Sequence, residues 1–338
     1  MELRDYQIKG ANDGCRILKE KGLVYFCWSV RTGKTLTALQ TAENYGAKNV
    51  LFLTKKKAIK SIEGDYNTFG FSFNLTVINY ESLHKVEGNF DLIILDENHG
   101  NSRYPKPAKR TKEIKLRYSR LPMIMLSGTP TAETASQWYH QLWLSINSPF
   151  NEWATFYKWA AHFVDVQQRN LGYATVKDYT KAKEDLIDKY IKPYVLTFSQ
   201  EEAGFNSKVD IEVLNIEPMN SQLITRLKKD KLIIGKEESI IADTGAKLMQ
   251  KIHQLENGTI KFESGNAQIL DYSKAEFIKE RFKGKKIAIF YYYKAELELL
   301  KDVFDNFTED LSEFNETDKV YIGQQHSNAL GVNLSKAE

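Results

Sequence analysis

The eight residues WSVRTGKT, at positions 28–35, decide the fold that we expect for this chain. The apolar residues LVYFC precede them at positions 23–27, and the helix-forming residues LTALQTA follow at positions 36–42. A buried strand, a turn that ends in Gly-Lys-Thr and a helix are the expected setting of a phosphate-binding loop. In such a loop, backbone N–H groups and the positive end of the helix point at a polyphosphate. An ordinary strand-turn-helix corner is the alternative for this stretch alone.

Two side chains of this loop would carry its chemistry. Lys34 can reach terminal phosphates, and the hydroxyl of Thr35 is placed to bind Mg²⁺. The full pattern is Gly-x-x-x-x-Gly-Lys-[Ser/Thr], and Trp28 stands in place of its first glycine. The remaining residues expected around the phosphates are Arg31, Thr32 and Gly33.

Composition narrows the class of protein. A length of 338 residues suits two domains, and 42% hydrophobic with 27% charged residues is typical of a globular protein. A net charge of +3 is too small to indicate nucleic acid by itself. Only Cys15 and Cys27 occur, which fits a reducing cytosol. No apolar run approaches the roughly 20 residues of a membrane span, and the polar first residues do not form a signal peptide.

A second decisive stretch is FDLIILDENH, at positions 90–99. Its branched aliphatic residues predict a strand that delivers Asp96 and Glu97 at its carboxyl end, the edge where ligands bind in open α/β sheets. Asp96 would hold Mg²⁺ through water, opposite Thr35. Glu97 would polarise the attacking water as a general base. A plain polar turn is the alternative if this stretch is taken alone.

Other predicted strands also end in polar residues. The apolar run at 49–54 is followed by three lysines, and the strand at 75–80 by ESLHK. Cations here would face a nucleic-acid phosphate backbone, although a solvated lysine cluster is an equal alternative. The candidates for phosphate contact are Lys55, Lys56, Ser82 and Lys85. The run PMIMLSGTP at 122–130 places the hydroxyls of Ser127 and Thr129 on a tight turn.

These features, in this order and spacing, resemble superfamily 2 helicases: Gln7, the Gly-Lys-Thr loop, Asp96-Glu97-x-His99 and the Ser-Gly-Thr-Pro turn. The chain is similar to the branch with Swi/Snf-like DNA translocases and compact phage DEAD/DEAH-box helicases. The resemblance implies two RecA-like lobes, ATP bound between them and nucleic acid across both. It also implies that Gln7 binds adenine, and that His99, Ser127 and Thr129 couple the nucleotide state to nucleic-acid contact.

The same resemblance organises the rest of the chain. It predicts a first lobe at 1–205, with a helical insertion at about 131–198, and a partial second lobe at 206–338 that is incomplete at the C-terminus. A boundary as late as residue 235 is the alternative. Aromatic residues at helical spacing in the insertion indicate a core. Further predictions are helices at 178–192, 221–232 and 246–255, a half-exposed strand at 209–216, and a strand at 285–293 followed by a helix. The last residues resemble a motif that touches ATP and nucleic acid, through Gly331 and Ser327.

One expected feature is missing from the second half. Relatives brace the γ-phosphate with arginines of the second lobe, and an arginine finger is worth about 10³–10⁵ in rate. Between residues 231 and 338 the only arginine is Arg281, in a charged helix. We therefore expect a fragment, or slow hydrolysis unless the arginine comes from elsewhere. Many relatives also carry glycine where this chain has Arg31, which bears on loop shape and affinity.

We interpret the sequence as an ATP-dependent DNA helicase or translocase that uses Mg²⁺. The expected partner is nucleic acid, with DNA favoured over RNA, and we expect a monomer in the cytoplasm of a bacterial or phage-infected cell, with no membrane. Three alternatives stay open: a nucleic-acid-binding module with weak or no ATPase, the motor part of a restriction system, and an RNA helicase.

Overall fold

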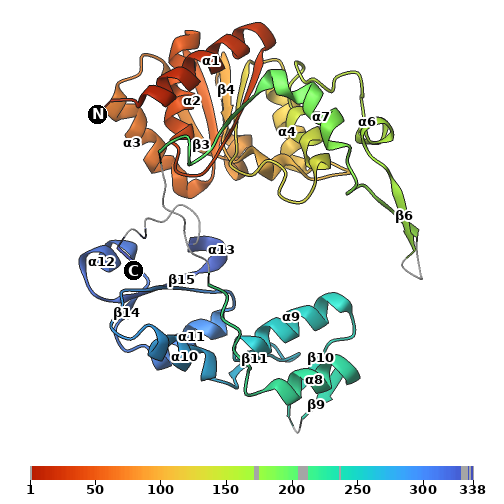
Figure 1. Cartoon of the computed structure of the whole chain (residues 1–338), viewed down its shortest axis with the longest axis vertical. Coiled ribbons are helices and arrows are strands. Elements are labelled where there is room, and N and C mark those ends of the chain that lie inside the picture. The colour runs from red at the N-terminus through yellow and green to blue at the C-terminus, as the bar shows by residue number, and fades with distance from the viewer. Residues whose placement is uncertain are drawn as a thin grey trace. The chain divides into compact units, whose positions relative to one another are not determined.

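The chain folds into two compact units, Met1–Lys208 and Val209–Glu338, which we call unit 1 and unit 2. The computed structural model describes residues 2–170, 175–204, 212–235, 237–328, 334 and 336–337. Figure 1 shows the chain as a ribbon, coloured from red at the N-terminus to blue at the C-terminus.

Unit 1 is built on a six-stranded parallel sheet with the strand order β3-β2-β4-β5-β1-β8. The five apolar runs that the sequence predicts as strands in its first 130 residues all form strands of this sheet, so that prediction is confirmed. The strands are β1 (Leu23–Trp28), β2 (Asn49–Thr54), β3 (Asn74–Asn79), β4 (Leu92–Leu95), β5 (Met123–Leu126) and β8 (Val195–Phe198).

Helices cover both faces of the sheet (Figure 1). Successive side chains of a strand point to opposite faces, so β1 contributes Val24 and Phe26 to one core and Leu23 and Tyr25 to another. The first core includes α1 (Asp5–Lys21), α2 (Lys34–Tyr45) and α3 (Ile59–Phe69), and the second includes α4 (Lys109–Tyr118), α5 (Trp138–Leu142), α6 (Phe156–Phe163) and α7 (Glu184–Ile191). Burial on both faces explains why the strands are continuous apolar runs.

Residues 131–198 differ from the helical insertion that the sequence predicts. They contain α5, α6 and α7, but β6 (Gln167–Asn170) and β7 (Thr175–Asp178) also pair as an antiparallel ribbon. In Figure 1 this ribbon extends beyond α6, away from the sheet. The segment ends in β8, which joins the main sheet beside β1. The segment is therefore helical in part, and its strands were not predicted because short polar strands lack the apolar alternation that marks a strand in sequence.

The helix predicted at 178–192 begins six residues late. Asp178 is the last residue of β7, and α7 starts at Glu184. Pro193 follows the helix as predicted, in a short 3₁₀ turn. The aromatic residues of the segment form the predicted core, with Tyr139, Trp159 and Phe163 fully buried, whereas Tyr157 is half-exposed.

Unit 2 contains two cores. One joins α8 (Ser221–Asp230) and α9 (Gly245–Glu256) to the hairpin of β9 (Leu232–Ile234) with β10 (Ser239–Ile241) and to β11 (Thr259–Lys261). β11 pairs with β12 (Ala267–Ile269), whose Ile269 packs against the second core. The other joins a three-stranded parallel sheet to α10 (Ser273–Arg281) and α11 (Lys294–Val303). Its strands are β13 (Ala288–Tyr291), β15 (Val320–Gln324) and β14 (Phe307–Thr308), with α12 (Leu311–Glu316) and α13 (Gln325–Asn328) nearby in sequence. The predicted helices at 221–232 and 246–255 and the strand–helix pair at 285–300 are confirmed.

The strand predicted at 209–216 is wrong where it can be tested. Residues 212–216 have no strand conformation, and 209–211 lie outside the described residues. Glu212 pairs with Arg281 at 3.1 Å rather than lying beside a partner strand. An alternating pattern forms a strand only where a neighbour supplies the ladder of hydrogen bonds.

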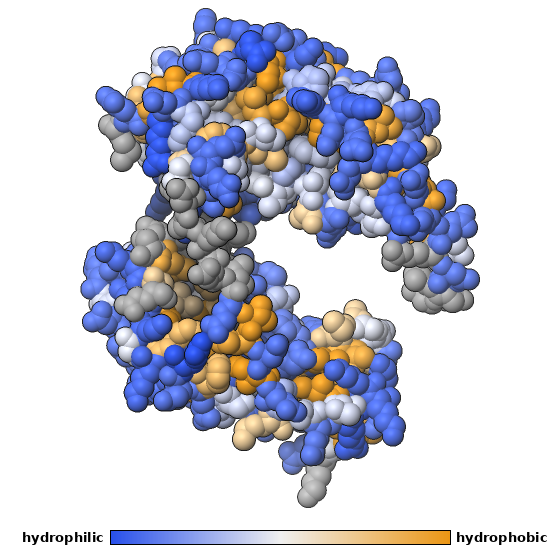
Figure 2. All heavy atoms as spheres, viewed as in Figure 1, coloured by the Kyte–Doolittle hydropathy of each residue, from blue (hydrophilic) through white to orange (hydrophobic). Residues whose placement is uncertain are grey.

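The surface of each unit is mixed. Figure 2 shows mostly hydrophilic side chains on the visible face, with apolar groups between them in separate patches. Among the described residues, no helix combines the length and the apolar character needed to cross a membrane.

Candidate active site

The loop between β1 and α2 takes a conformation that depends on its glycine. Gly33 caps α2 with φ +80°, a left-handed conformation that side chains disfavour, and a Cβ there would collide with the side-chain amide of Gln7. Arg31 is also left-handed, with φ +64°, at the position where the resemblance led us to expect glycine. No side chain caps the first turn of α2. Its N–H groups are therefore available to an anion.

Lys34 lies across the hollow of this loop. Its Nζ donates a hydrogen bond to Ser29 O at 3.0 Å, and Thr32 Oγ1 donates to the same carbonyl at 2.7 Å. Burial lowers the pKa of Lys34, while the negative charges of Glu97 and then Asp96 raise it. The lysine and both carboxylates thus share one site, although about sixty residues separate them in the chain.

The hydroxyl of Thr35 lies at the start of α2. Within the described part of the chain this hydroxyl has no hydrogen-bond partner, and the side chain is half-buried. A hydroxyl at this place can serve as an oxygen ligand of a hard cation.

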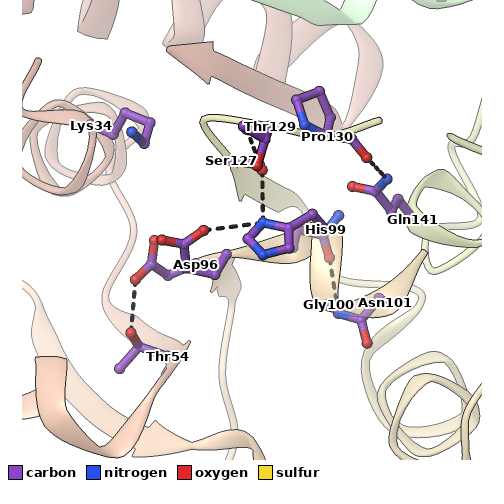
Figure 3. Close-up of polar contacts among 12 residues, drawn as sticks. Lys34, Thr54, Asp96, His99, Gly100, Asn101, Ser127, Thr129, Pro130 and Gln141 are labelled. Carbon is purple, nitrogen blue, oxygen red and sulfur yellow. Dashed lines mark hydrogen bonds and ion pairs between the residues drawn. The ribbon is translucent and has the colours of Figure 1, made fainter. Parts of the chain in front are cut away.

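Asp96 follows β4 directly and is held from three directions. Its Oδ2 accepts a hydrogen bond from Thr54 Oγ1 at 2.8 Å (Figure 3), its carbonyl accepts one from Tyr80 OH at 2.6 Å, and its N–H donates to Leu53 O. Burial raises the pKa of Asp96, and the hydrogen bond from Thr54 opposes the rise. A positioned and partly desolvated carboxylate is a suitable ligand for a cation.

Glu97 leaves the strand in a strained conformation. Its φ is +50°, a rare value for a residue other than glycine. Its Oε2 lies 3.1 Å from His99 Nδ1, and the same nitrogen lies 3.0 Å from Ser127 Oγ. Because an ionised carboxylate can only accept hydrogen bonds, we infer that His99 Nδ1 carries a hydrogen and donates it to Glu97. The hydrogen bond from His99 lowers the pKa of Glu97 despite its burial, which keeps the carboxylate ionised.

The Ser-Gly-Thr-Pro turn after β5 closes the site. Ser127 is fully buried and its Oγ accepts the N–H of Thr129 at 3.1 Å. A Cβ built on Gly128 would lie 3.7 Å from Lys34 Nζ, so the turn also approaches the phosphate loop. Figure 3 shows Ser127 and Thr129 above His99, with Lys34 to their left. The side chain of Thr129 is exposed.

A buried chain of hydrogen bonds continues behind this turn, and sequence reasoning missed it. Tyr25 OH donates to Gln141 Oε1 at 2.7 Å, and Gln141 Nε2 donates to Pro130 O at 2.7 Å (Figure 3). Tyr25 and Gln141 are both fully buried. Burial raises the pKa of Tyr25, and hydrogen bonds from Ser127 and Asn98 lower it. Strand β1, the turn after β5 and α5 are thus joined by polar contacts that no local sequence signal marks.

The other predicted residues are placed as follows. Gln7 is buried and its Oε1 accepts the N–H of Arg4 at 2.9 Å, in a capping box at the start of α1, while its amide nitrogen faces Gly33.

The groups after β2 and β3 lie at one edge, because Thr54 is paired with Asn79. At that edge Lys55, Lys56 and Lys85 are exposed and Ser82 is half-buried. Lys55 lies near enough to lower the pKa of Glu97. Gly331 lies outside the described residues, and nothing is described of the side chain of Ser327.

Comparisons with known proteins give only distant likenesses. No family model and no curated protein matches the chain. One similar structure is the Pyrococcus furiosus Hef helicase domain, 14% identical, covering 97% of this chain and 88% of that one at a TM-score of 0.45. Another is a nuclease-deletion mutant of the Type ISP restriction-modification enzyme LlaGI in complex with a DNA substrate mimic. It is 17% identical over 38% of this chain and only 18% of that chain, at a TM-score of 0.29. We therefore base the functional conclusions on this chain's own residues.

Proposed function

We propose that this chain is an ATP-dependent motor on nucleic acid, a helicase or translocase that acts on DNA. The observation that carries the proposal is the meeting of Lys34 with Asp96 and Glu97 at the carboxyl edge of one parallel sheet. A cation beside an uncapped helix N-terminus suits a polyphosphate. The two carboxylates of the site would have different tasks: Asp96 would hold a metal ion and Glu97 would accept a proton.

The residues present fit Mg²⁺ bound together with a nucleotide. Within the described residues, no group of three or more His, Cys, Asp or Glu side chains could hold a metal by itself. Asp96 and Thr35 supply two oxygens, and Mg²⁺ commonly takes one or two carboxylates, with phosphates and water as its remaining ligands. When bound, Mg²⁺ would neutralise charge on the transferring phosphoryl group.

The protein's own residues would then perform distinct tasks. Lys34 leaves Ser29 O to bind the terminal phosphates. Glu97, kept ionised by His99, takes a proton from the attacking water. His99 holds this carboxylate and Ser127 together, so a shift of either group reaches the other. Through Ser127 and Thr129, the state of the site would affect the turn that follows β5.

Nucleic acid would lie along the same edge of the sheet. Lys55, Lys56 and Lys85 are exposed there, with Ser82 beside them. Cations and hydroxyls at one edge suit a phosphate backbone, which carries no sequence information by itself. Units 1 and 2 would be the two RecA-like lobes, and Gly331 and Ser327 of the second would add contacts to ATP and nucleic acid.

ATP turnover by the chain alone, and with single-stranded DNA, duplex DNA or RNA, tests the proposal. Lys34→Ala should abolish ATP binding in calorimetry, and unchanged affinity would remove the phosphate loop from the proposal. Glu97→Gln should keep ATP binding while hydrolysis falls by about 10²–10⁴-fold, the usual contribution of a general base. Undiminished hydrolysis in that variant would exclude Glu97 as the base.

A nucleic-acid-binding module with weak ATPase is the second candidate. Arg31 occupies a glycine-like conformation in the loop, and Arg281 is paired with Glu212 rather than free to brace a phosphate. Strand binding without any stimulated turnover would favour this candidate over a motor.

A further inference from the structure

Unit 2 contains a groove that the proposed ATP site does not use. Its volume is about 670 Å³, within the usual range of ligand sites. Helices α8 and α9 and the turn after β13 form its walls. The residues that matter here are Lys228, Met249, His253, Glu256, Tyr292 and Tyr293.

Aromatic rings form one wall of this groove. Tyr292 and Tyr293 have ring centroids 4.8 Å apart at 65°, and His253 lies 5.0 Å from Tyr292 and 5.4 Å from Tyr293 at similar angles. The ring of His326 lies 4.6 Å from the ring of Tyr292, at 64°. In such edge-to-face contacts the edge of one ring rests on one face of another, so a single contact leaves the second face of that ring uncovered. Because Tyr292 and Tyr293 line the groove and are only half-buried, a flat ligand can stack on them.

Hydrogen bonds fix the ring of Tyr293 in place. Its hydroxyl lies 3.4 Å from Gln250 O and 3.3 Å from His253 Nδ1. Both partners belong to α9, so these hydrogen bonds connect this helix to the turn after β13. A preorganised ring loses little entropy when a ligand binds.

The position of the groove within unit 2 is also that of a binding site. Tyr292 and Tyr293 directly follow Tyr291, the last residue of β13, and His326 directly follows β15 in α13. β13 and β15 are parallel neighbours. Ligands of open parallel sheets bind outside the carboxyl ends of the strands.

The remaining lining residues supply apolar contact and charge. Met249 is 70% exposed, and its thioether can pack against an aromatic ring. Lys228 offers a cation to a phosphate, and Glu256 offers a carboxylate that accepts a hydrogen bond from an N–H group of a base. An aromatic face, one cation and one acceptor together match a nucleobase with a single phosphate.

We propose that this groove binds a base of single-stranded nucleic acid, stacked on Tyr292 and Tyr293, with Lys228 at the neighbouring phosphate. The inference deepens the proposed function, since it gives unit 2 its own contact with the strand. A free nucleoside triphosphate fits less well, because one lysine faces the groove and the walls include no glycine-rich turn to surround a polyphosphate. Stacking is tolerant of sequence, so the contact would suit movement along a strand.

Strand binding by the full chain tests this inference, in the absence of ATP. Fluorescence anisotropy would compare labelled oligodeoxythymidylate with an abasic strand of the same length. Tyr292→Leu keeps bulk but removes the ring, and should weaken oligodeoxythymidylate about fivefold to hundredfold, the range for one stacked base. Tyr292→Phe keeps the ring and should stay within about twofold of the wild type. Neither variant should change the affinity for the abasic strand.

A methionine pair supplies a matched control. Met249→Ala should weaken oligodeoxythymidylate a few-fold, whereas Met219→Ala, at a position that is 81% exposed in the same unit but outside the groove, should not. Equal losses on both strands, or no loss with Tyr292→Leu, would overturn the inference. Displacement of the strand by AMP, with AMP binding also lost in Tyr292→Leu, would instead make this a site for free nucleotide. Because no ATP is present, the measurement is independent of the proposed function. Base binding in the groove can be detected in a chain without ATPase activity, and it can be absent from a chain that hydrolyses ATP.

Discussion

The buried pair Tyr25 and Gln141 offers a quantitative test of how unit 1 is held together. These residues lie 116 positions apart, and their side chains share a 2.7 Å hydrogen bond in a fully buried place. Gln141 also donates to Pro130 O and Gln137 O, at 2.7 and 3.0 Å. A double-mutant cycle of Tyr25→Phe and Gln141→Leu therefore isolates one polar contact between β1 and α5.

The expected magnitudes follow from the groups left without partners. A buried group that loses its partner costs about 1–3 kcal/mol. Tyr25→Phe strands Gln141 Oε1, so we expect a loss of about 1–3 kcal/mol in the free energy of unfolding. Gln141→Leu leaves both Tyr25 OH and Pro130 O without this partner, so we expect a larger loss of about 2–4 kcal/mol. The double variant should lose less than the sum, by about 1 kcal/mol, because the two changes remove one shared bond.

Tryptophan fluorescence during urea unfolding is the appropriate assay. All five tryptophans lie between residues 28 and 159, so the signal reports unit 1 alone. Gln168→Leu, at an exposed glutamine of β6, is the control and should change the free energy by no more than about 0.5 kcal/mol. Additivity of the two substitutions within about 0.3 kcal/mol, or a negligible effect of Gln141→Leu, would refute the reasoning.

Two further predictions concern the loop and the acid pair. Gly33→Ala should lower the free energy of unfolding by about 1–2 kcal/mol, because it places a side chain in the left-handed conformation. It should also weaken ATP binding in calorimetry, because Gln7 must move to make room for the Cβ. Wild-type affinity for ATP would contradict this. Asp96→Asn should stabilise unit 1 by about 0.5–2 kcal/mol at neutral pH while hydrolysis is lost. Burial raises the pKa of Asp96 above 3.8, so its contribution to stability is present at low pH and is lost as the pH rises through the raised value. The gain in the free energy of unfolding from Asp96→Asn should therefore increase with pH. Urea unfolding of both proteins at several pH values measures this gain, and a gain that is the same at every pH would refute the prediction.

The sequence alone predicted the first five strands of unit 1 and the residues at their ends. Long apolar runs reveal strands buried on both faces, and Gly-Lys-Thr and the acid pair directly follow two such runs. Because parallel strands share one carboxyl edge, their terminal residues could be expected near each other without knowledge of the packing. The aromatic core of residues 138–163 was likewise visible from helical spacing.

Only the tertiary structure decided how the segments after residue 131 are used. The ribbon β6–β7 is polar on both strands, and β8 becomes part of the main sheet only because an edge beside β1 is open to it. The pairing of Tyr25 with Gln141 and the groove at Tyr292 each join segments that are distant in sequence. Local periodicity reports which face of an element is buried, but it does not report which other element buries it. That choice depends on the packing of the whole unit.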